Sequence, residues 1–171
     1  MKRRPLLLIS LLVMLLSACV PPSPSSSRTS SCVHLYFVSQ LEHGPALAWE
    51  EFPGADPTAE ELIGALLAGP SSEMLSSPFP PGLSLRACRL EDGLLSIDFS
   101  EQYGGLSAVS LTLADYALVL TLCQLEEVDS LSITVSGRPL PYRSHHILSY
   151  QEALLALEES RSPLDKSTSS R

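Results

Sequence analysis

Residues 91–100 read EDGLLSIDFS, and this stretch decides how the chain folds. Its Asp92-Gly93 pair is a strong signal for a tight turn between two antiparallel strands. After the turn, apolar and polar residues alternate as far as Phe99, which predicts a strand with one face against a core. Residues 83–90 are predicted to form the partner strand, so the two segments are expected to form a hairpin.

Further strands and two helices are expected on either side of this hairpin. A helix should begin at the capping box Thr58-x-x-Glu61 and stop at Gly69-Pro70. The elements are predicted at residues 33–38, 46–52, 58–69, 83–90, 94–99, 110–125 and 131–135. This order, ββαββαβ, predicts an α+β fold in which a small mixed or antiparallel sheet carries both helices on one face.

The N-terminal residues predict export from the cytoplasm. A basic start is followed by an apolar run at 6–16 and two small residues, which is the layout of a signal peptide over residues 1–18. Leu16-Ser17-Ala18-Cys19 resembles the lipobox of bacterial lipoproteins at all four positions. The resemblance implies cleavage before Cys19, lipid on the Cys19 sulfur and durable membrane attachment by two or three acyl chains. The alternative is an ordinary secreted protein.

The rest of the chain divides into four parts by composition. Residues 19–31 form a Pro/Ser linker that cannot bury enough apolar surface to fold. Residues 32–140 form the folded domain. A C-terminal extension, 141–159, contains a short helix that begins at the capping box Ser149-x-x-Glu152. Residues 160–171 are polar and are expected to be a disordered tail.

Charge excludes two classes of partner. The full chain has 11 Lys and Arg against 19 Asp and Glu. Three basic residues lie within 1–18, so the mature chain carries 8 basic residues against 19 acidic ones and a formal charge of −11. Such a surface binds neither nucleic acid nor anionic lipid headgroups well, so the lipid on Cys19 must hold the protein to the membrane.

The cysteines leave one question open. Cys19 is used for lipid, which leaves Cys32, Cys88 and Cys123. Cys88 and Cys123 lie in apolar surroundings and are interpreted either as two buried thiols or as a disulfide, while Cys32 is expected to be free. Their spacing matches no zinc motif, so no metal is expected.

The sequence contains no recognisable catalytic motif. The adjacent His145-His146 pair would need distant partners to bind a metal and is interpreted as a surface pair. Neither an HExxH metal motif nor a Gly-x-Ser-x-Gly nucleophile elbow is present. We therefore expect no enzymatic activity and no cofactor.

Three stretches of the chain, in this order, form a recognisable pattern. The first is Leu66-Leu67-Ala68-Gly69-Pro70, and the second is Asp92-Gly93 followed by Ile97-Asp98-Phe99-Ser100. The third is Thr121-Leu122, then Val128 and the segment 133–137 that ends in Gly137. Together they resemble a GerMN domain, the module named after a bacterial sporulation and germination lipoprotein. The match covers about residues 33–140 and contains one copy of the domain, where the founding member has two.

The resemblance implies a compact domain similar to ring-building motifs, which occur in secretion-like and sporulation membrane complexes. Members are usually lipoproteins of spore-forming and related Gram-positive bacteria. They are regarded as non-catalytic binding or assembly modules, so no catalytic residues are carried over. The expected place of the chain is the outer face of the cell membrane, held by its N-terminal lipid and bound to protein partners.

The motif residues are expected to have structural roles. Gly69 should cap a helix and Gly93 should adopt positive φ in the turn. Asp98 and Ser100 should bond to the backbone of the following loop, and Thr121 to a carbonyl of its own helix. The full set of motif residues is Gly69, Pro70, Asp92, Gly93, Asp98, Ser100, Thr121 and Gly137.

The leading hypothesis is a membrane-anchored, non-enzymatic binding or assembly module of a cell-envelope, sporulation or germination complex. A first alternative is a solute- or cell-wall-binding lipoprotein with a pocket lined by Tyr36, Trp49 or Tyr103. A second alternative is a hydrolase of envelope polymers, which would need a pair of carboxylates.

Overall fold

The computed structural model describes residues 32–41, 44–141 and 146–161. The predicted signal peptide, the lipidation of Cys19, the linker and the residues from 162 onward lie outside the described residues. The elements are β1 (His34–Leu41), β2 (Gly44–Glu51), α2 (Ala59–Ala68), β3 (Leu75–Ser76), β4 (Leu85–Glu91), β5 (Leu94–Phe99), the 3₁₀ helix η1 (Glu101–Gly105), α3 (Ala108–Leu122), β6 (Ser130–Val135), β7 (Arg138–Pro139), β8 (Ile147–Ser149) and α4 (Tyr150–Arg161).

The predicted α+β class and the element order are confirmed. Each helix and strand expected between residues 33 and 135 is present, with its ends displaced by a few residues. The structure adds η1 and the strands β3, β7 and β8, which are two to three residues long. Strands this short contain too few residues for a period-2 pattern to appear in the sequence.

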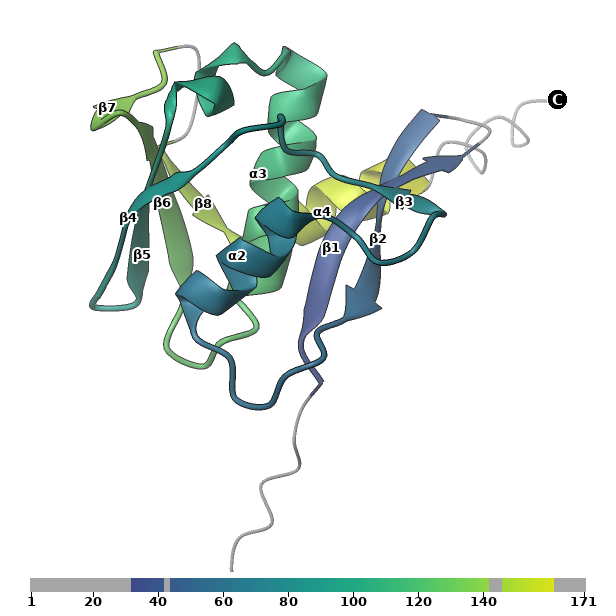
Figure 1. Cartoon of the computed structure of the whole chain (residues 1–171), viewed down its shortest axis with the longest axis horizontal. Coiled ribbons are helices and arrows are strands. Elements are labelled where there is room, and N and C mark those ends of the chain that lie inside the picture. The colour runs from purple at the N-terminus through teal and green to yellow at the C-terminus, as the bar shows by residue number, and fades with distance from the viewer. Residues whose placement is uncertain (1–31, 42–43, 142–145, 162–171) are drawn as a thin grey trace, which may run out of the picture. The chain divides into compact units, whose positions relative to one another are not determined.

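The strands form two sheets, where the sequence pattern predicts one. Sheet A has the order β2-β1-β3, and sheet B has the order β4-β5-β6-β7 with β8 also paired to β6. In sheet B, β5 pairs antiparallel with β4 and parallel with β6. Helices α2 and α3 lie between the two sheets (Figure 1), so sheet B has helices on one face, as predicted, and sheet A lies on their other side.

The division into two sheets follows from what occupies the edges. The edge of β1 that does not pair with β2 is bonded by Gln124 and Thr121 from the region of α3, and further along by β3. The edge of β5 that does not pair with β4 is bonded by β6. Both edges are therefore occupied, and neither is available to join the two hairpins into one sheet.

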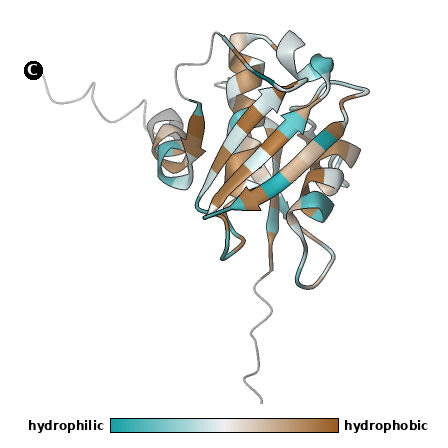
Figure 2. Ribbon diagram, turned by 90° about the vertical axis from the view of Figure 1, so that its left-hand side faces the viewer, coloured by the Kyte–Doolittle hydropathy of each residue, from teal (hydrophilic) through white to brown (hydrophobic). Residues whose placement is uncertain are grey.

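One hydrophobic core fills the space between the sheets. The alternating residues Leu95, Ile97 and Phe99 of β5 are at most 1% exposed, and α3 is buried along most of its length. The opposite face of sheet B is turned to solvent, and hydrophilic and hydrophobic residues alternate along its strands (Figure 2). Within the described residues, no helix is both long and apolar enough to cross a membrane.

Candidate functional site

The Asp92-Gly93 turn joins β4 to β5 and is fixed by a close contact with the loop before β6. Both residues have positive φ, 48° and 79°, as a type I′ hairpin turn requires. The Gly93 carbonyl accepts hydrogen bonds from the N–H groups of Asp129 and Ser130. A Cβ atom at Gly93 would overlap the carboxylate of Asp129, an exposed side chain that can turn aside, so the positive φ is the reason that this position favours glycine.

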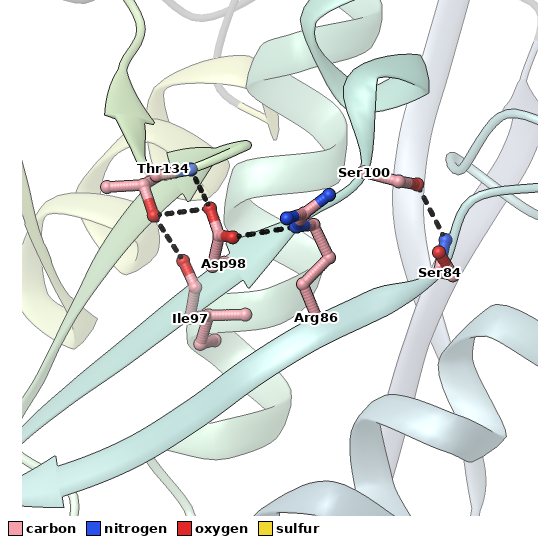
Figure 3. A network of polar contacts seen from close by, with 7 residues as sticks. Ser84, Arg86, Ile97, Asp98, Ser100 and Thr134 are labelled. Atoms are coloured by element: carbon pink, nitrogen blue, oxygen red, sulfur yellow. Dashed lines mark hydrogen bonds and ion pairs between the residues drawn. The ribbon is translucent and has the colours of Figure 1, made fainter.

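Asp98 is the centre of a polar network on the solvent-facing side of sheet B (Figure 3). Its Oδ1 accepts hydrogen bonds from the Thr134 hydroxyl at 2.8 Å and from the Gly137 N–H at 2.7 Å. Its Oδ2 accepts from Nε of Arg86 at 3.2 Å. One carboxylate therefore joins strands β4, β5 and β6 and the turn into β7.

The network sets the charge state of Asp98. Desolvation by burial acts to raise the pKa of Asp98, but the hydrogen bonds from Gly137 and Thr134, aided by Arg86, outweigh it and lower this pKa below its ordinary value. Asp98 is therefore ionised at neutral pH. The predicted side-chain-to-backbone bond is present, although its partner is Gly137 and not the loop that follows Asp98.

Ser100 and Gly137 complete the ends of the strands. The Ser100 hydroxyl accepts a hydrogen bond from the Ser84 N–H at 3.0 Å and so holds the chain where it enters β4, instead of the loop after β5 (Figure 3). Ser136 and Gly137 have φ of 50° and 74°, which makes the β6–β7 connection a second turn of the type I′ kind.

Of the motif residues on the helices, Gly69 ends one helix and Thr121 bonds the other to sheet A. Gly69 ends α2 with φ of 91°, its N–H donates to the Leu66 carbonyl, and Pro70 follows it. The Thr121 hydroxyl is fully buried and accepts from the Tyr36 N–H at 3.1 Å, so it links α3 to β1 instead of bonding back along its helix. These positions anchor backbone segments to one another.

Several partners in these networks carry no local signal in the sequence. Gln124 accepts from the His34 N–H and donates to the His34 carbonyl, at 2.9 and 2.7 Å. Tyr103 donates to the buried Asp115 at 2.6 Å and stacks on Phe99. Because Tyr103 is fully buried, it does not line a pocket together with the exposed Trp49.

The cysteines in the described domain are free thiols. Cys32 is exposed, while Cys88 and Cys123 are half-buried and form no disulfide. Burial, together with the charge of Glu60 and a hydrogen bond to it, raises the pKa of Cys88 to about 11. Burial and the nearby Asp129 raise the pKa of Cys123 to about 11. Both are therefore poor nucleophiles at neutral pH.

A pair of aromatic rings, His34 and Trp49, lies on the face of sheet A opposite the one from which Phe37 enters the core. His34 and Trp49 are diagonal neighbours on β1 and β2, and their ring centroids lie 4.0 Å apart. Trp49 is 52% exposed, and β2 is the outer strand of its sheet. In the described ranges, no group of three or more His, Cys, Asp or Glu side chains could hold a metal ion, and His146 is exposed.

The fold and these networks define the class of the molecule: a small α+β domain of two sheets, in which a motif-bearing hairpin is tied to the other strands of sheet B. Solved structures share this fold. The first GerMN domain of the sporulation protein GerM from Bacillus subtilis matches with a TM-score of 0.58 and 17% identity, over 71% of this chain and 98% of that one.

The structure of the tandem GerMN domains of GerM from Bacillus subtilis matches with a TM-score of 0.57 and 19% identity, over 75% of this chain. The match spans 48% of that structure, about half its length. A search of curated proteins finds no significant match. The family model for Germane, described as "Sporulation and spore germination", matches residues 34–141, and the chain belongs to this family.

Proposed function

We propose that this chain is a membrane-anchored lipoprotein that acts as a non-enzymatic binding or assembly module of a cell-envelope, sporulation or germination complex. It is held on the outer face of the cell membrane by lipid on Cys19, and it binds protein partners. It binds no nucleic acid and needs no metal or cofactor. The observation that carries the proposal is membership of a sporulation and germination family over residues 34–141.

The placement at the membrane is supported by the sequence before the domain. Residues 16–19 match a lipobox, and the Pro/Ser segment 20–31 gives a spacer of roughly 35 Å at about 3 Å per residue. The formal charge of −11 disfavours binding to an anionic bilayer by charge. Lipid and spacer together hold an acidic domain away from the headgroups, where it can meet other proteins.

The binding role is supported by how the motif residues are used. Gly69, Gly93, Asp98 and Thr121 are engaged in caps, turns and cross-strand bonds, so the family motif builds a scaffold. No enzyme class is associated with the family name. The function then lies on the surfaces that the scaffold presents.

Co-purification from crosslinked membranes tests the proposal. The tagged full chain is expressed in cells of its source organism, the membranes are crosslinked, and the recovered proteins are identified. The matched control carries the same residues 1–31 in front of an unrelated soluble domain. We expect defined envelope proteins that are enriched only with the native domain. Recovery of the same proteins with both chains would count against the proposal.

A second assay separates the binding role from hydrolysis. Purified protein is incubated with peptidoglycan, with and without divalent metals, and the released fragments are measured. We expect no release above that of buffer. Fragments that appear in proportion to protein concentration would favour the hydrolase.

A further inference from the structure

The outer edge of β2 presents a row of backbone groups with no partner in the described part of the chain. The Phe52 N–H donates to the Val33 carbonyl, while the backbone of His34 is bonded to Gln124 on the other side of β1. Backbone groups alternate in direction along an antiparallel strand. In the register that pairs His34 with Glu51, the N–H and C=O groups of Leu47, Trp49 and Glu51 therefore point away from β1.

Two devices that protect exposed strands, a bulge and a proline in the middle of the strand, are missing from this edge. β2 is eight residues long, its register with β1 has no bulge, and its proline, Pro45, lies next to its first residue. The edge of sheet B at β4 is different, since its register shifts between Leu85 and Ala87. A long regular edge strand is a template for another strand, so β2 is the better docking edge of the two.

The side chains beside the edge indicate what kind of strand would fit. Trp49, the third residue from the C-terminal end of β2, is half exposed and its ring contacts that of His34. An added strand would place a side chain directly beside the indole, where an apolar group or a cation gains contact. Large exposed aromatic side chains of this kind are frequent binding hot spots.

Charge selects a basic partner. The three strands of sheet A contain no Lys or Arg, and Glu50 and Glu51 end β2. The Glu50 carboxylate accepts hydrogen bonds from Ser71 and Ser72, so the attraction for a basic strand is assigned to the exposed Glu51. The basic side chains that the structure describes, Arg86, Arg89 and Arg138, lie on β4 and β7 of sheet B. A second copy of the chain carries the same acidic net charge, which disfavours pairing of β2 with a second β2.

We propose that the open edge of β2 is a docking site for an extended basic segment of a partner protein, which adds to sheet A as an outer strand beside Trp49. This inference rests on the proposed function as a protein-binding module and names the surface and the partner chemistry. Backbone hydrogen bonds to residues 47–51 supply affinity, and the indole and Glu51 supply selectivity.

A direct test uses a synthetic peptide with the purified full chain. The probe is acetyl-(Lys-Val)₄-amide with a fluorescent label, and binding is followed by anisotropy. Three control peptides separate the contributions: the acidic analogue (Glu-Val)₄, a scrambled analogue, and a version that is N-methylated at alternate residues. N-methylation removes backbone donors but keeps the charge, so it should weaken binding by tenfold or more. Equal binding of the methylated peptide would overturn the inference.

Variants of the chain locate the site. Trp49→Ala should weaken binding by about thirtyfold, as loss of a hot-spot aromatic does. Glu51→Pro removes an outward N–H without removing a bond to β1, and it should also weaken binding. Glu101→Gln, at an exposed carboxylate on η1, should leave binding within about twofold. Circular dichroism and the urea midpoint report whether each variant folds.

The remaining outcomes separate this inference from the proposed function. Size-exclusion chromatography that finds a dimer abolished by Glu51→Pro would replace the partner with a second copy and overturn the inference. If envelope proteins still crosslink to Trp49→Ala and Glu51→Pro at wild-type yield, the docking edge is wrong while the proposed function stands. If neither the peptide nor any envelope protein binds the wild-type chain, both the docking edge and the proposed function are wrong.

Discussion

Replacement of Asp98 by alanine should destabilise the domain by about 3 kcal/mol at pH 7. The carboxylate accepts two short hydrogen bonds, from Thr134 and Gly137, and bonds to a charged group contribute about 1.5–3 kcal/mol each. Gly137 is exposed, so its hydrogen bond to Asp98 is expected to contribute about 1.5 kcal/mol, the low end of this range. Arg86 is 55% exposed, so its ion pair adds at most about 0.5 kcal/mol.

Urea unfolding measures this loss, with Trp49, the single tryptophan of the chain, as the fluorescent reporter. At an m value of about 2 kcal/mol/M, the midpoint of Asp98→Ala should fall by about 1.5 M. Asp98→Asn keeps one acceptor oxygen and should lose less. The control is Ser96→Ala on the same strand and the same face, which is expected to change stability by less than about 0.5 kcal/mol.

The effect should depend on pH in one direction. The pKa of Asp98 is lower in the folded chain than in the unfolded chain, where it is about 3.9. The contribution of Asp98 to the free energy of unfolding is therefore fully present above pH values of about 3.9 and is lost as the pH falls through the folded pKa. The difference between wild type and Asp98→Ala should therefore shrink on going from pH 7 to pH 2.5. A midpoint equal to that of wild type at pH 7, or a difference that is unchanged at pH 2.5, would refute the role assigned to the ionised carboxylate.

Three other predictions follow from the same structure. Gly93→Ala forces φ of 79° on a residue with a Cβ, so it should cost about 1–2 kcal/mol, while the exposed Asp129 side chain turns aside at little cost. Gly64→Ala, in open space within α2, should gain about 0.5–1 kcal/mol. Urea midpoints decide both, and a neutral Gly93→Ala would contradict the strain assigned to the positive φ. Thr121→Val leaves the Tyr36 N–H without its acceptor and should cost about 1–3 kcal/mol, measured in the same way; equal midpoints would mean that another group accepts this bond. At pH 8, iodoacetamide should label the exposed Cys32 first, because Cys88 and Cys123, with pKa values of about 11, are thiolate in only about one molecule in a thousand. Mass spectrometry of timed samples gives the order of labelling. Simultaneous labelling of all three cysteines would contradict this prediction.

Local signals in the sequence predicted the elements well. The Asp92-Gly93 turn, the capping boxes at Thr58 and Ser149 and the alternation along β5 are all determined by neighbours within a few residues. For such features the sequence window that shows the pattern also contains the physical cause.

Features that depend on distant partners could not be predicted. Asp98 bonds to Thr134 and Gly137, 36 and 39 positions away, and Thr121 bonds to Tyr36 across 85 positions. The division into two sheets has the same origin, because strand patterns do not specify which edges meet. The open edge of β2 could be recognised only from the strand register, because the sequence does not show which strands pair with β2 or whether any element covers Trp49.

The central claim is that this domain binds envelope proteins while lipid on Cys19 holds it at the membrane. The most direct measurement compares wild type with Cys19→Ala after crosslinking, by fractionation and by the yield of co-purified envelope proteins. We predict that Cys19→Ala leaves the membrane fraction with an unchanged urea midpoint and loses those proteins. A variant that is released from the membrane yet recovers the same partners at wild-type yield would contradict the claim that tethering is part of the function.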